Sequence, residues 1–407
     1  MKGSARALAA AWLTGCLICS TLASAASHAS RAQEVLRRWK LPGLSIAASR
    51  DGKVVWAEGL GYANLEHGVP VTPDTSFRIA SISKSFTATL MARLRERGLL
   101  DLDVPVQRYA PGFPDKGVPI TLRQLAAHRS GLAHYTDVDL VNATHYADMT
   151  AALAKFRDRP LESPPGTKFR YSSFGYNLIG AAVEGVTHEP FVMAMAREVT
   201  GPLGLGHTVP DEYARIIPGR AAFYTRHTDE EPRNAPAVDN SDVWPAGGYL
   251  STASDLVRFG YAVVEGDFLT PASRELLLSP VPENVAEGES FGLGWQVEQR
   301  DGFSVVGHDG SHVGCMARLR VYRGTGVAVA VLVNLSIESE NEVERALSDL
   351  VHATALEFIA SSKEYRRPPA ARRADAASGP SAIRPSPRCG PRRRTGTAAG
   401  SDRSCPS

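Results

Sequence analysis

The sequence has few cysteines and few lysines, and no large excess of charge of one sign. Of its 407 residues, 45 are basic, only eight of them lysine, and 43 are acidic. Residues 26–365 carry a net charge of −8, so this part of the chain gives no support for nucleic-acid binding. The five cysteines form no disulfide framework, and Cys315 lies in an apolar run typical of a core residue. With 43% hydrophobic and 22% charged residues, the composition excludes a disordered or fibrous protein.

A long uninterrupted apolar run is also missing. The apolar stretch of residues 7–22 is broken by small residues and is too short and mixed for a membrane span. It follows Lys2 and Arg6 and precedes Ala23-Ser24-Ala25, which fits a cleavage site. The sequence therefore predicts a signal peptide over residues 1–25 and an exported protein, periplasmic or secreted, with no membrane span after the signal is removed. One alternative stays open, because the residues ending at Cys16 also fit a lipoprotein box, which would leave a lipid anchor on Cys16.

The C-terminal segment differs from the rest of the chain in composition. From Arg366 onward it has ten arginines, two aspartates and almost no large apolar residue. Such a segment cannot bury enough surface to fold, so residues 366–407 are predicted to be disordered. The basic tail could contact an anionic cell-surface polymer or lipid, or simply be solvated.

Strand patterns lie near both ends of the body of the chain. Residues 44–50 and 53–59 flank Asp51-Gly52, which suits a tight primed hairpin turn. Later β-rich runs cover residues 294–298, 303–306, 317–322 and 327–333, and an amphipathic helix is predicted over 340–359. Helical pieces with Pro/Gly-rich loops fill the middle.

These patterns predict an α+β fold in which strands from both chain ends share one antiparallel sheet flanked by helices. The sheet lobe is expected to contain residues 34–80 and 285–362, and an all-helical lobe residues 81–284. A cleft where two such lobes meet is a common place for a ligand.

Ser81-Ile82-Ser83-Lys84 opens a predicted helix and is the first candidate for chemistry. Ser81 and Lys84 are three residues apart and therefore share one face of the helix. A serine hydroxyl is a poor nucleophile until a base takes its proton. A nearby lysine can do so if its charge is destabilised, and the positive end of the helix dipole has that effect. On its own, an ordinary helix start with a surface lysine is the simpler interpretation.

Tyr171-Ser172-Ser173 is the second candidate, between a Pro-Pro-Gly turn and a helix predicted over residues 175–184. The pKa of a free phenol is about 10. Beside a protonated lysine the phenolate becomes accessible, and the tyrosine can then act as a general base. Taken alone, a tyrosine that packs its ring at a lobe boundary is the simpler interpretation.

The segment from Gly307 to Ser311, with His308, Asp309 and Gly310 between them, is the third candidate, at the end of a predicted strand. A His-x-Gly sequence there can place an imidazole over a cleft, and Gly310 permits close approach of a substrate backbone. The amide of Ser311 could donate to an oxyanion. A turn with a solvent-facing histidine is the simpler interpretation in isolation.

In order and context, however, these three motifs resemble those of the β-lactamase-related serine hydrolases, which include class C β-lactamases, D-alanyl-D-alanine carboxypeptidases and related esterases. The resemblance covers about residues 34–360 and is greatest to the mitochondrial-type branch of that superfamily. Further stretches that carry it are Trp56–Tyr62, Phe77–Lys84, Leu100–Val106, His128–Tyr135, Gly247–Thr252 and Gly292–Trp295.

The resemblance implies a β-lactamase/transpeptidase-like fold and a role for each motif residue, without metal or cofactor. Ser81 would form the acyl-enzyme, with Lys84 assisting removal of its proton. Tyr171 would be the base and later the acid toward the leaving group. His308 would steady Tyr171 and a substrate carboxylate, and the backbone amides of Ser81 and Ser311 would form the oxyanion hole.

Two positions depart from the pattern of many relatives. Ser173 stands where an asparagine often helps to bind the acyl amide, and its hydroxyl can still hydrogen-bond Lys84 but offers less to a peptide or β-lactam. Asp309 stands where threonine or serine is common, and its carboxylate would repel a substrate carboxylate or hold His308 protonated. Both departures argue against efficient β-lactam hydrolysis.

The favoured prediction is therefore peptidase or amidase action on a small peptide-like substrate, possibly derived from peptidoglycan. An esterase with the same mechanism and a non-catalytic scaffold or cell-wall binder remain alternatives.

Two other motifs are given a structural interpretation. The Gly-x-Ser-x-Gly sequence at residues 288–292 matches the nucleophile elbow of α/β-hydrolases, but the strand before it and the helix after it that such an elbow needs are not predicted here. His128 and His134 flank a Ser-Gly turn and are interpreted as packed or turn-capping residues rather than metal ligands. The sequence does not determine the oligomeric state.

Overall fold

The structure is a computed structural model that describes residues 28–227, 230–281, 285–286, 289–337 and 341–361. The predicted signal peptide, the lipoprotein-box residue Cys16 and the arginine-rich tail lie outside the described residues. Among those that are described, no helix is both long and apolar enough to span a membrane.

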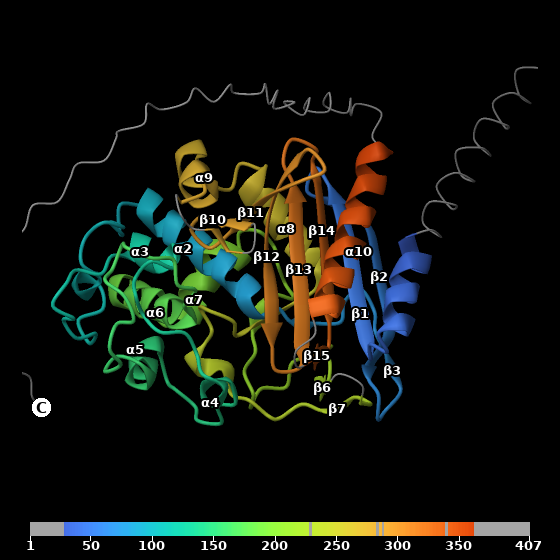
Figure 1. The fold of residues 1–407 in the computed structure, drawn as a ribbon, viewed down its shortest axis with the longest axis horizontal. Helices are drawn as coiled ribbons and strands as arrows, with labels where there is room; N and C mark the ends of the chain where they lie inside the picture. The colour runs from blue at the N-terminus through green and yellow to red at the C-terminus, as the bar shows by residue number, and fades with distance from the viewer. Residues whose placement is uncertain (1–27, 228–229, 282–284, 287–288, 338–340, 362–407) are drawn as a thin grey trace, which may run out of the picture. The chain divides into compact units, whose positions relative to one another are not determined.

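An antiparallel sheet, nine-stranded within the described residues, forms the centre of the fold (Figure 1). Its strand order is β3-β2-β1-β14-β13-β12-β11-β10-β9. The strands are β1 (Gly43–Arg50), β2 (Lys53–Asn64), β3 (Val69–Pro70), β9 (Val285–Ala286), β10 (Glu289–Phe291), β11 (Gln296–Arg300), β12 (Phe303–His312), β13 (Cys315–Tyr322) and β14 (Val327–Val333). Because β1 pairs directly with β14, the prediction that strands from both chain ends share one sheet is confirmed.

The first hairpin forms where the sequence predicts it. Asp51 and Gly52 connect β1 to β2 with φ angles of +49° and +76°, the left-handed conformation that a primed turn requires. Every residue of β14 is buried, as are all those of β1 except Arg50 at its end. These strands read as continuous apolar or small residues because helices cover both faces of the sheet at this point.

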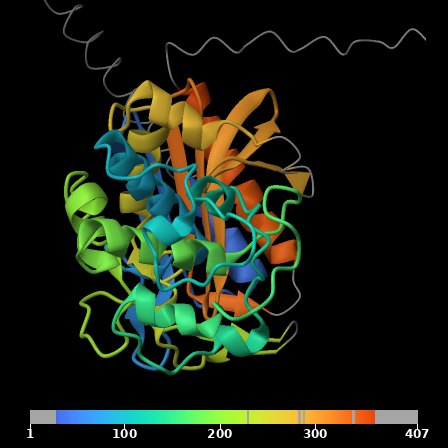
Figure 2. The same cartoon turned by 90° about the vertical axis from the view of Figure 1, so that its left-hand side faces the viewer.

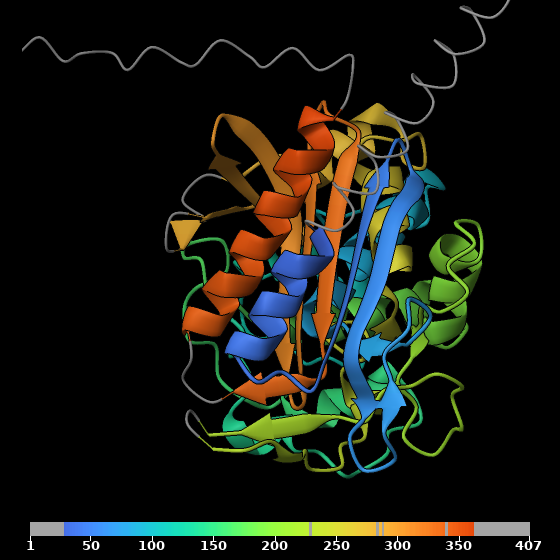
Figure 3. The ribbon, with the colours of Figure 1, turned by 90° about the vertical axis from the view of Figure 1, so that its right-hand side faces the viewer.

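Two hydrophobic cores lie on opposite faces of the sheet. On one face pack the N-terminal helix, residues 28–38, and α10 (Asn341–Ala360), as Figure 3 shows. On the other face, α8 (Ala253–Val264) lies against β1, β13 and β14, and α2 (Ser83–Glu96) packs beyond it. The stacked rings of Phe86 and Phe259, with centroids 3.6 Å apart, join α2 to α8 in this second core.

The middle of the chain lies on the α8 side of the sheet (Figure 2). Its other helices are α3 (Leu122–Ala126), α4 (Asp137–Leu140), α5 (Met149–Ala152), α6 (Ser173–Thr187), α7 (Phe191–Met195) and α9 (Pro271–Leu278). This region is not purely helical. It also contributes strands to two small sheets, one of β4 (Phe77–Arg78), β8 (Tyr249–Ser251) and β5 (Val209–Pro210), and one of β15 (Leu335–Ile337), β6 (Tyr224–Arg226) and β7 (Arg233–Asn234).

Candidate active site

Ser81 lies in a 3₁₀ turn, Ala80–Ile82, that leads directly into α2. The turn begins with Ala80 at a φ of +44°, a left-handed conformation that is strained for a residue with a side chain. Tertiary contacts hold it in place, since the amide of Ile79 donates to the carbonyl oxygen of Tyr249 on β8 at 3.0 Å. The predicted helix start is thus a tight turn that leaves the Ser81 side chain partly exposed.

Lys84 is completely buried one turn below Ser81. Its Nζ donates to Ser81 Oγ at 3.0 Å and to the carbonyl oxygen of Ala246 at 2.8 Å. Burial lowers the pKa of Lys84 well below its usual value, because the ammonium form loses its hydration. A neutral amine has a free electron pair, so the same short contact to Ser81 can also run in the other direction, from hydroxyl to amine.

Tyr171 completes the group, because its hydroxyl is hydrogen-bonded to the Ser81 side chain. The Lys84 Nζ lies 5.0 Å from the centroid of the Tyr171 ring. Burial raises the pKa of Tyr171 and outweighs the opposing effect of the Ser81 hydrogen bond. The sequence suggested a phenolate beside a charged lysine, but removal from water favours the neutral form of both groups. Burial therefore disfavours both charged forms, the ammonium of Lys84 and the phenolate of Tyr171.

His308 lies on β12 with its ring centroid 6.4 Å from that of Tyr171. Its Nδ1 is 2.6 Å from the carbonyl oxygen of Asp309, which can only accept, so Nδ1 carries the proton. Burial, the largest cause, lowers the pKa of His308 to about 4. His308 is therefore neutral at pH 7, and its buried Nε2, an acceptor, has no hydrogen-bond partner among the described residues.

Asp309 lies on the opposite face of the sheet from the site, since successive residues of a strand alternate between faces. Its carboxylate accepts from Arg320 at 2.7 Å and pairs with Arg318 at 3.2 Å. Burial would raise the pKa of Asp309, but the charges of these two arginines hold it below its usual value. The expectation that Asp309 repels a substrate carboxylate or keeps His308 protonated is therefore wrong, because the pleat turns the carboxylate toward the arginines of β13.

Gly310 and Ser311 lie where β12 meets the Ser81 turn. A Cβ on Gly310 would come within 2.3 Å of the carbonyl oxygen of Ile79, so only glycine allows this approach. His312 and Cys315 face each other across the two-residue loop between β12 and β13. Because hydrogen bonding alternates along an antiparallel strand, the amide of the preceding residue, Ser311, points away from β13 and toward the β11 side. The pairing of β11 with β12 reaches only Gly307, so among the described residues no strand is paired with Ser311 on that side.

Ser173 begins α6, and Ser172 caps the helix by accepting from the amide of Gly175 at 3.1 Å. Within the described part of the chain, Ser173 does not hydrogen-bond Lys84. The carbonyl oxygen of Ala246 takes that place instead. No sequence pattern indicates this contact, because the acceptor is a backbone atom and Ala246 is remote from Lys84 along the chain.

The structure brings further residues to Tyr171 that sequence reasoning set aside. The ring of His128 stacks on Tyr171 with centroids 4.2 Å apart, and His134 contacts the same ring edge-on. Phe291 on β10 lies 6.3 Å from Tyr171 and 6.5 Å from His308, measured between ring centroids. Only the spacing of aromatic residues around the motifs could have suggested these contacts.

Ser290 does not form a nucleophile elbow. It lies in β10, paired with Val297 of β11 and Val285 of β9, and a further strand, β11, follows in place of a helix.

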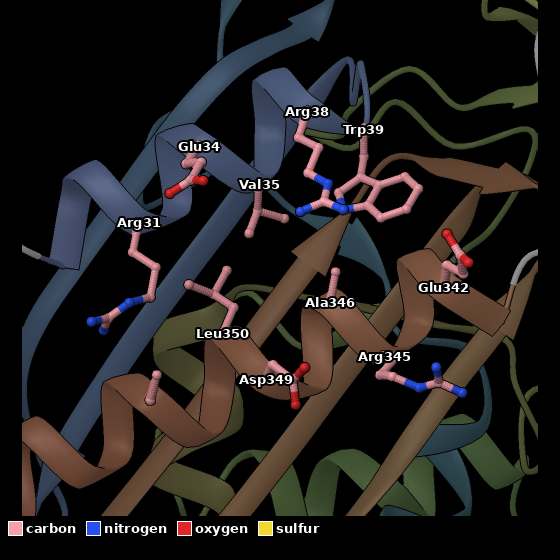
Figure 4. Close-up of a pocket in the computed structure, with 11 residues that line it drawn as sticks. Arg31, Glu34, Val35, Arg38, Trp39, Glu342, Arg345, Ala346, Asp349 and Leu350 are labelled. Atoms are coloured by element: carbon pink, nitrogen blue, oxygen red, sulfur yellow. The ribbon is translucent and has the colours of Figure 1, made fainter.

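A groove of about 520 Å³ between the N-terminal helix and α10 contains none of the site residues (Figure 4). Arg31, Arg38 and Arg345 alternate there with acidic residues, and the groove lies on the face of the sheet away from Ser81.

Comparison with known proteins shows which family the chain is similar to. The human serine beta-lactamase-like protein LACTB, mitochondrial, is 31% identical over 373 residues, which are 69% of this chain and 68% of that protein. Penicillin-binding protein 4 of Amycolatopsis lactamdurans is 32% identical over 319 residues, covering 72% of this chain and 81% of that protein. The chain spans between 63% and 68% of the length of its mammalian relatives.

Among solved structures, a D-stereospecific amidohydrolase from Streptomyces superposes with a TM-score of 0.66 at 25% identity, covering 79% of this chain and 98% of that one. Fold and relatives together define a beta-lactamase-related serine hydrolase. The beta-lactamase family matches residues 30–354, and the chain belongs to that family.

The burial of Lys84 predicts a specific pH dependence of stability. Because its pKa is lowered in the folded state, the unfolded chain binds more protons below about pH 10.4, the ordinary lysine pKa. The free energy of unfolding should therefore rise between about pH 8 and about pH 10, by up to about 1.4 kcal/mol per pH unit, relative to a Lys84→Met variant. Urea unfolding of both proteins across this range measures the difference.

A Lys53→Met variant is the control, because Lys53 is exposed at the start of β2. Removing this lysine should shift stability by the same amount at every pH in the range. A constant difference between wild type and the Lys84→Met variant at every pH would mean that Lys84 stays charged in the folded protein.

Proposed function

We propose that the chain is an exported hydrolase that forms an acyl-enzyme at Ser81 and acts on a small peptide-like substrate. The observation that carries this proposal is the buried amine of Lys84, which lies 3.0 Å from Ser81 Oγ and whose pKa is lowered well below its usual value by burial. A lysine hidden from water beside an accessible hydroxyl is a costly arrangement for stability and a useful one for removing a proton.

Acylation would proceed by addition and elimination. Ser81 Oγ bonds to the substrate carbonyl carbon, and its proton passes to Lys84 Nζ, directly or through the Tyr171 hydroxyl. The oxygen that becomes negative is stabilised by the amides of Ser81 and Ser311. When the carbon–nitrogen bond breaks, the leaving amine takes a proton from Tyr171, which Lys84 then reprotonates. Water releases the acyl group by the reverse route, and Ser81 recovers its proton.

The neutral state of His308 bears on the substrate. A neutral imidazole that already donates its Nδ1 proton to Asp309 offers the site an acceptor at Nε2 rather than a positive charge. The expected anchoring of a substrate carboxylate by His308 therefore lacks an electrostatic basis, and an amide or ester without a carboxylate fits better. The amidohydrolase from Streptomyces and the penicillin-binding relative support amide chemistry.

Esterase activity is the second candidate, and Ser173 is the observation that favours it. A hydroxyl offers less than an asparagine amide for binding the acyl amide of a peptide or β-lactam. An ester also has a better leaving group and needs less help from Tyr171. Export rests on residues 1–25 alone, with a lipid on Cys16 as the alternative, and sequencing the mature N-terminus distinguishes the two.

Covalent labelling tests the nucleophile. Incubation with a fluorophosphonate or a labelled penicillin should add one probe to the wild-type protein, seen by intact mass, because Ser81 is activated. The Ser81→Ala variant should remain unlabelled, and the Ser290→Ala variant should be labelled like wild type. Absence of any adduct on folded wild-type protein would favour the non-catalytic scaffold.

Removing the Tyr171 hydroxyl should slow acylation by about 100-fold, at the lower end of the effect of general acid–base groups. The Tyr171→Phe variant keeps the ring and therefore its packing, so its unfolding transition should match that of wild type. Stopped-flow labelling gives the rate. Tyr322→Phe is the matched control, because it removes a buried hydroxyl on the opposite face of the sheet. An unchanged rate in the Tyr171→Phe variant removes Tyr171 from the mechanism.

A substrate panel tests the class of substrate. D-amino-acid amides and esters should give higher kcat/KM than β-lactams, because Ser173 replaces the amide that binds a β-lactam. Capping the terminal carboxylate of a peptide as an amide should change kcat/KM by less than about threefold, well short of the roughly 1.4 kcal/mol that a tenfold loss represents. A tenfold loss on capping would show that the site binds a carboxylate.

A further inference from the structure

We infer that His128 and His134 are positioning residues that hold Tyr171 against Ser81, an inference that rests on the proposed role of Tyr171. Both histidines belong to the short segment before α4, and neither hydrogen-bonds Ser81 or Lys84 within the described chain. They act on the segment that contains Tyr171, through its backbone and through its ring.

The backbone around His128 is tied to the segment leading to Tyr171. The amide of Arg170 donates to the carbonyl oxygen of His128 at 2.7 Å, and that of Gly166 donates to Arg129 at 2.7 Å. On the C-terminal side of Tyr171, Ser172 Oγ donates to the carbonyl oxygen of Ala133 at 2.7 Å. Tyr171 is therefore attached to a segment that is fixed on both sides of it.

The side chain of His128 adds two contacts to this frame. Its Nδ1 accepts from the amide of Ser172 at 3.1 Å, and its ring stacks on Tyr171 at 4.2 Å between centroids with an interplanar angle of 25°. His128 is only 1% exposed and has a φ of +55°, so the backbone is held in an uncommon conformation that turns the ring toward Tyr171.

His134 repeats the pattern one residue further along. Its Nδ1 accepts from the amide of Ser173 at 3.2 Å, and its ring meets Tyr171 edge-on, at 88° with centroids 5.4 Å apart. The first amides of an α-helix have no partner within the helix. Here two consecutive amides at the start of α6 are satisfied by two imidazoles, whose rings also contact the phenol from two directions.

This arrangement fits a positioning role better than a purely structural cap. A serine or aspartate would satisfy a helix amide equally well, but only a ring can also fix the plane of Tyr171. Each Nδ1 must be unprotonated to accept, and burial lowers the pKa of His128 well below its usual value, which keeps that acceptor available. Small displacements of a proton-transfer group have large effects on rate. Loss of either imidazole should therefore lower the rate of the chemical step and leave the affinity for the substrate or probe nearly unchanged.

Two substitutions separate the contributions of His128. His128→Asn keeps an acceptor near the position of Nδ1 and suits a positive φ, but it removes the ring. His128→Phe keeps a ring and removes the acceptor. With a fluorophosphonate as probe, each variant should lower the maximal rate of Ser81 labelling about tenfold or more and change the half-saturating concentration less than twofold. His134→Asn should have a smaller effect, because His134 is exposed. His188→Asn is the matched control, a histidine with a φ of +56° at the other end of α6.

A double-mutant cycle decides whether His128 acts through Tyr171. In the Tyr171→Phe background, where the hydroxyl that needs positioning is absent, His128→Asn should cause no further loss of labelling rate. An equal loss in both backgrounds, in proteins with matching unfolding transitions, overturns the inference and leaves the proposed function intact. The Tyr171→Phe variant alone tests the role of Tyr171, so the two failures can be distinguished.

Discussion

The exclusion of water from the amine of Lys84 is the constraint on which the rest of the structure depends. An ammonium group in that position would lack hydration, and Nζ has two hydrogen-bond acceptors among the described residues, Ser81 Oγ and the carbonyl oxygen of Ala246. Burial therefore favours the neutral amine at the expense of folding free energy, and it places the proposed base next to a partly exposed hydroxyl. The same exclusion of water raises the pKa of Tyr171, whereas it lowers that of Lys84, so the phenol keeps its proton.

The fold maintains this dry site from several distant parts of the chain. The turn of Ser81 is fixed to β8, and β12 approaches it so closely that Gly310 cannot bear a side chain. Lys84 is covered by the segment before β8, and Tyr171 enters from the start of α6. The Ser81 turn, the start of α6, the segment that leads into β8, and β12 lie far apart in the sequence. The ion pairs of Asp309 with Arg318 and Arg320 support β12 from the other face, where they are separated from the chemistry by the sheet itself.

Local sequence patterns predicted those features that local physics determines. Two β-rich runs on either side of an Asp-Gly turn predicted the first hairpin, and the serine–lysine spacing predicted two side chains that do meet. Features that depend on packing between distant segments were missed or wrong. The face on which Asp309 lies depends on strand register, the neutral state of His308 depends on burial, and the contact from Lys84 to Ala246 is made by a backbone atom without a side-chain signature. His128 was interpreted as a packed or capping residue, which describes its burial but not its contact with Tyr171.

The pairing of β1 with β14 has a consequence for how the protein is made. β1 leaves the ribosome before its neighbour β14, which follows nearly 280 residues later. Contacts of such long range are slow to form, and no nascent chain that ends before β14 can complete the sheet. The hydroxyl of Ser81, the proposed nucleophile, therefore lacks its finished surroundings until β14 has been made, and a chain that ends before β14 would not contain the complete site.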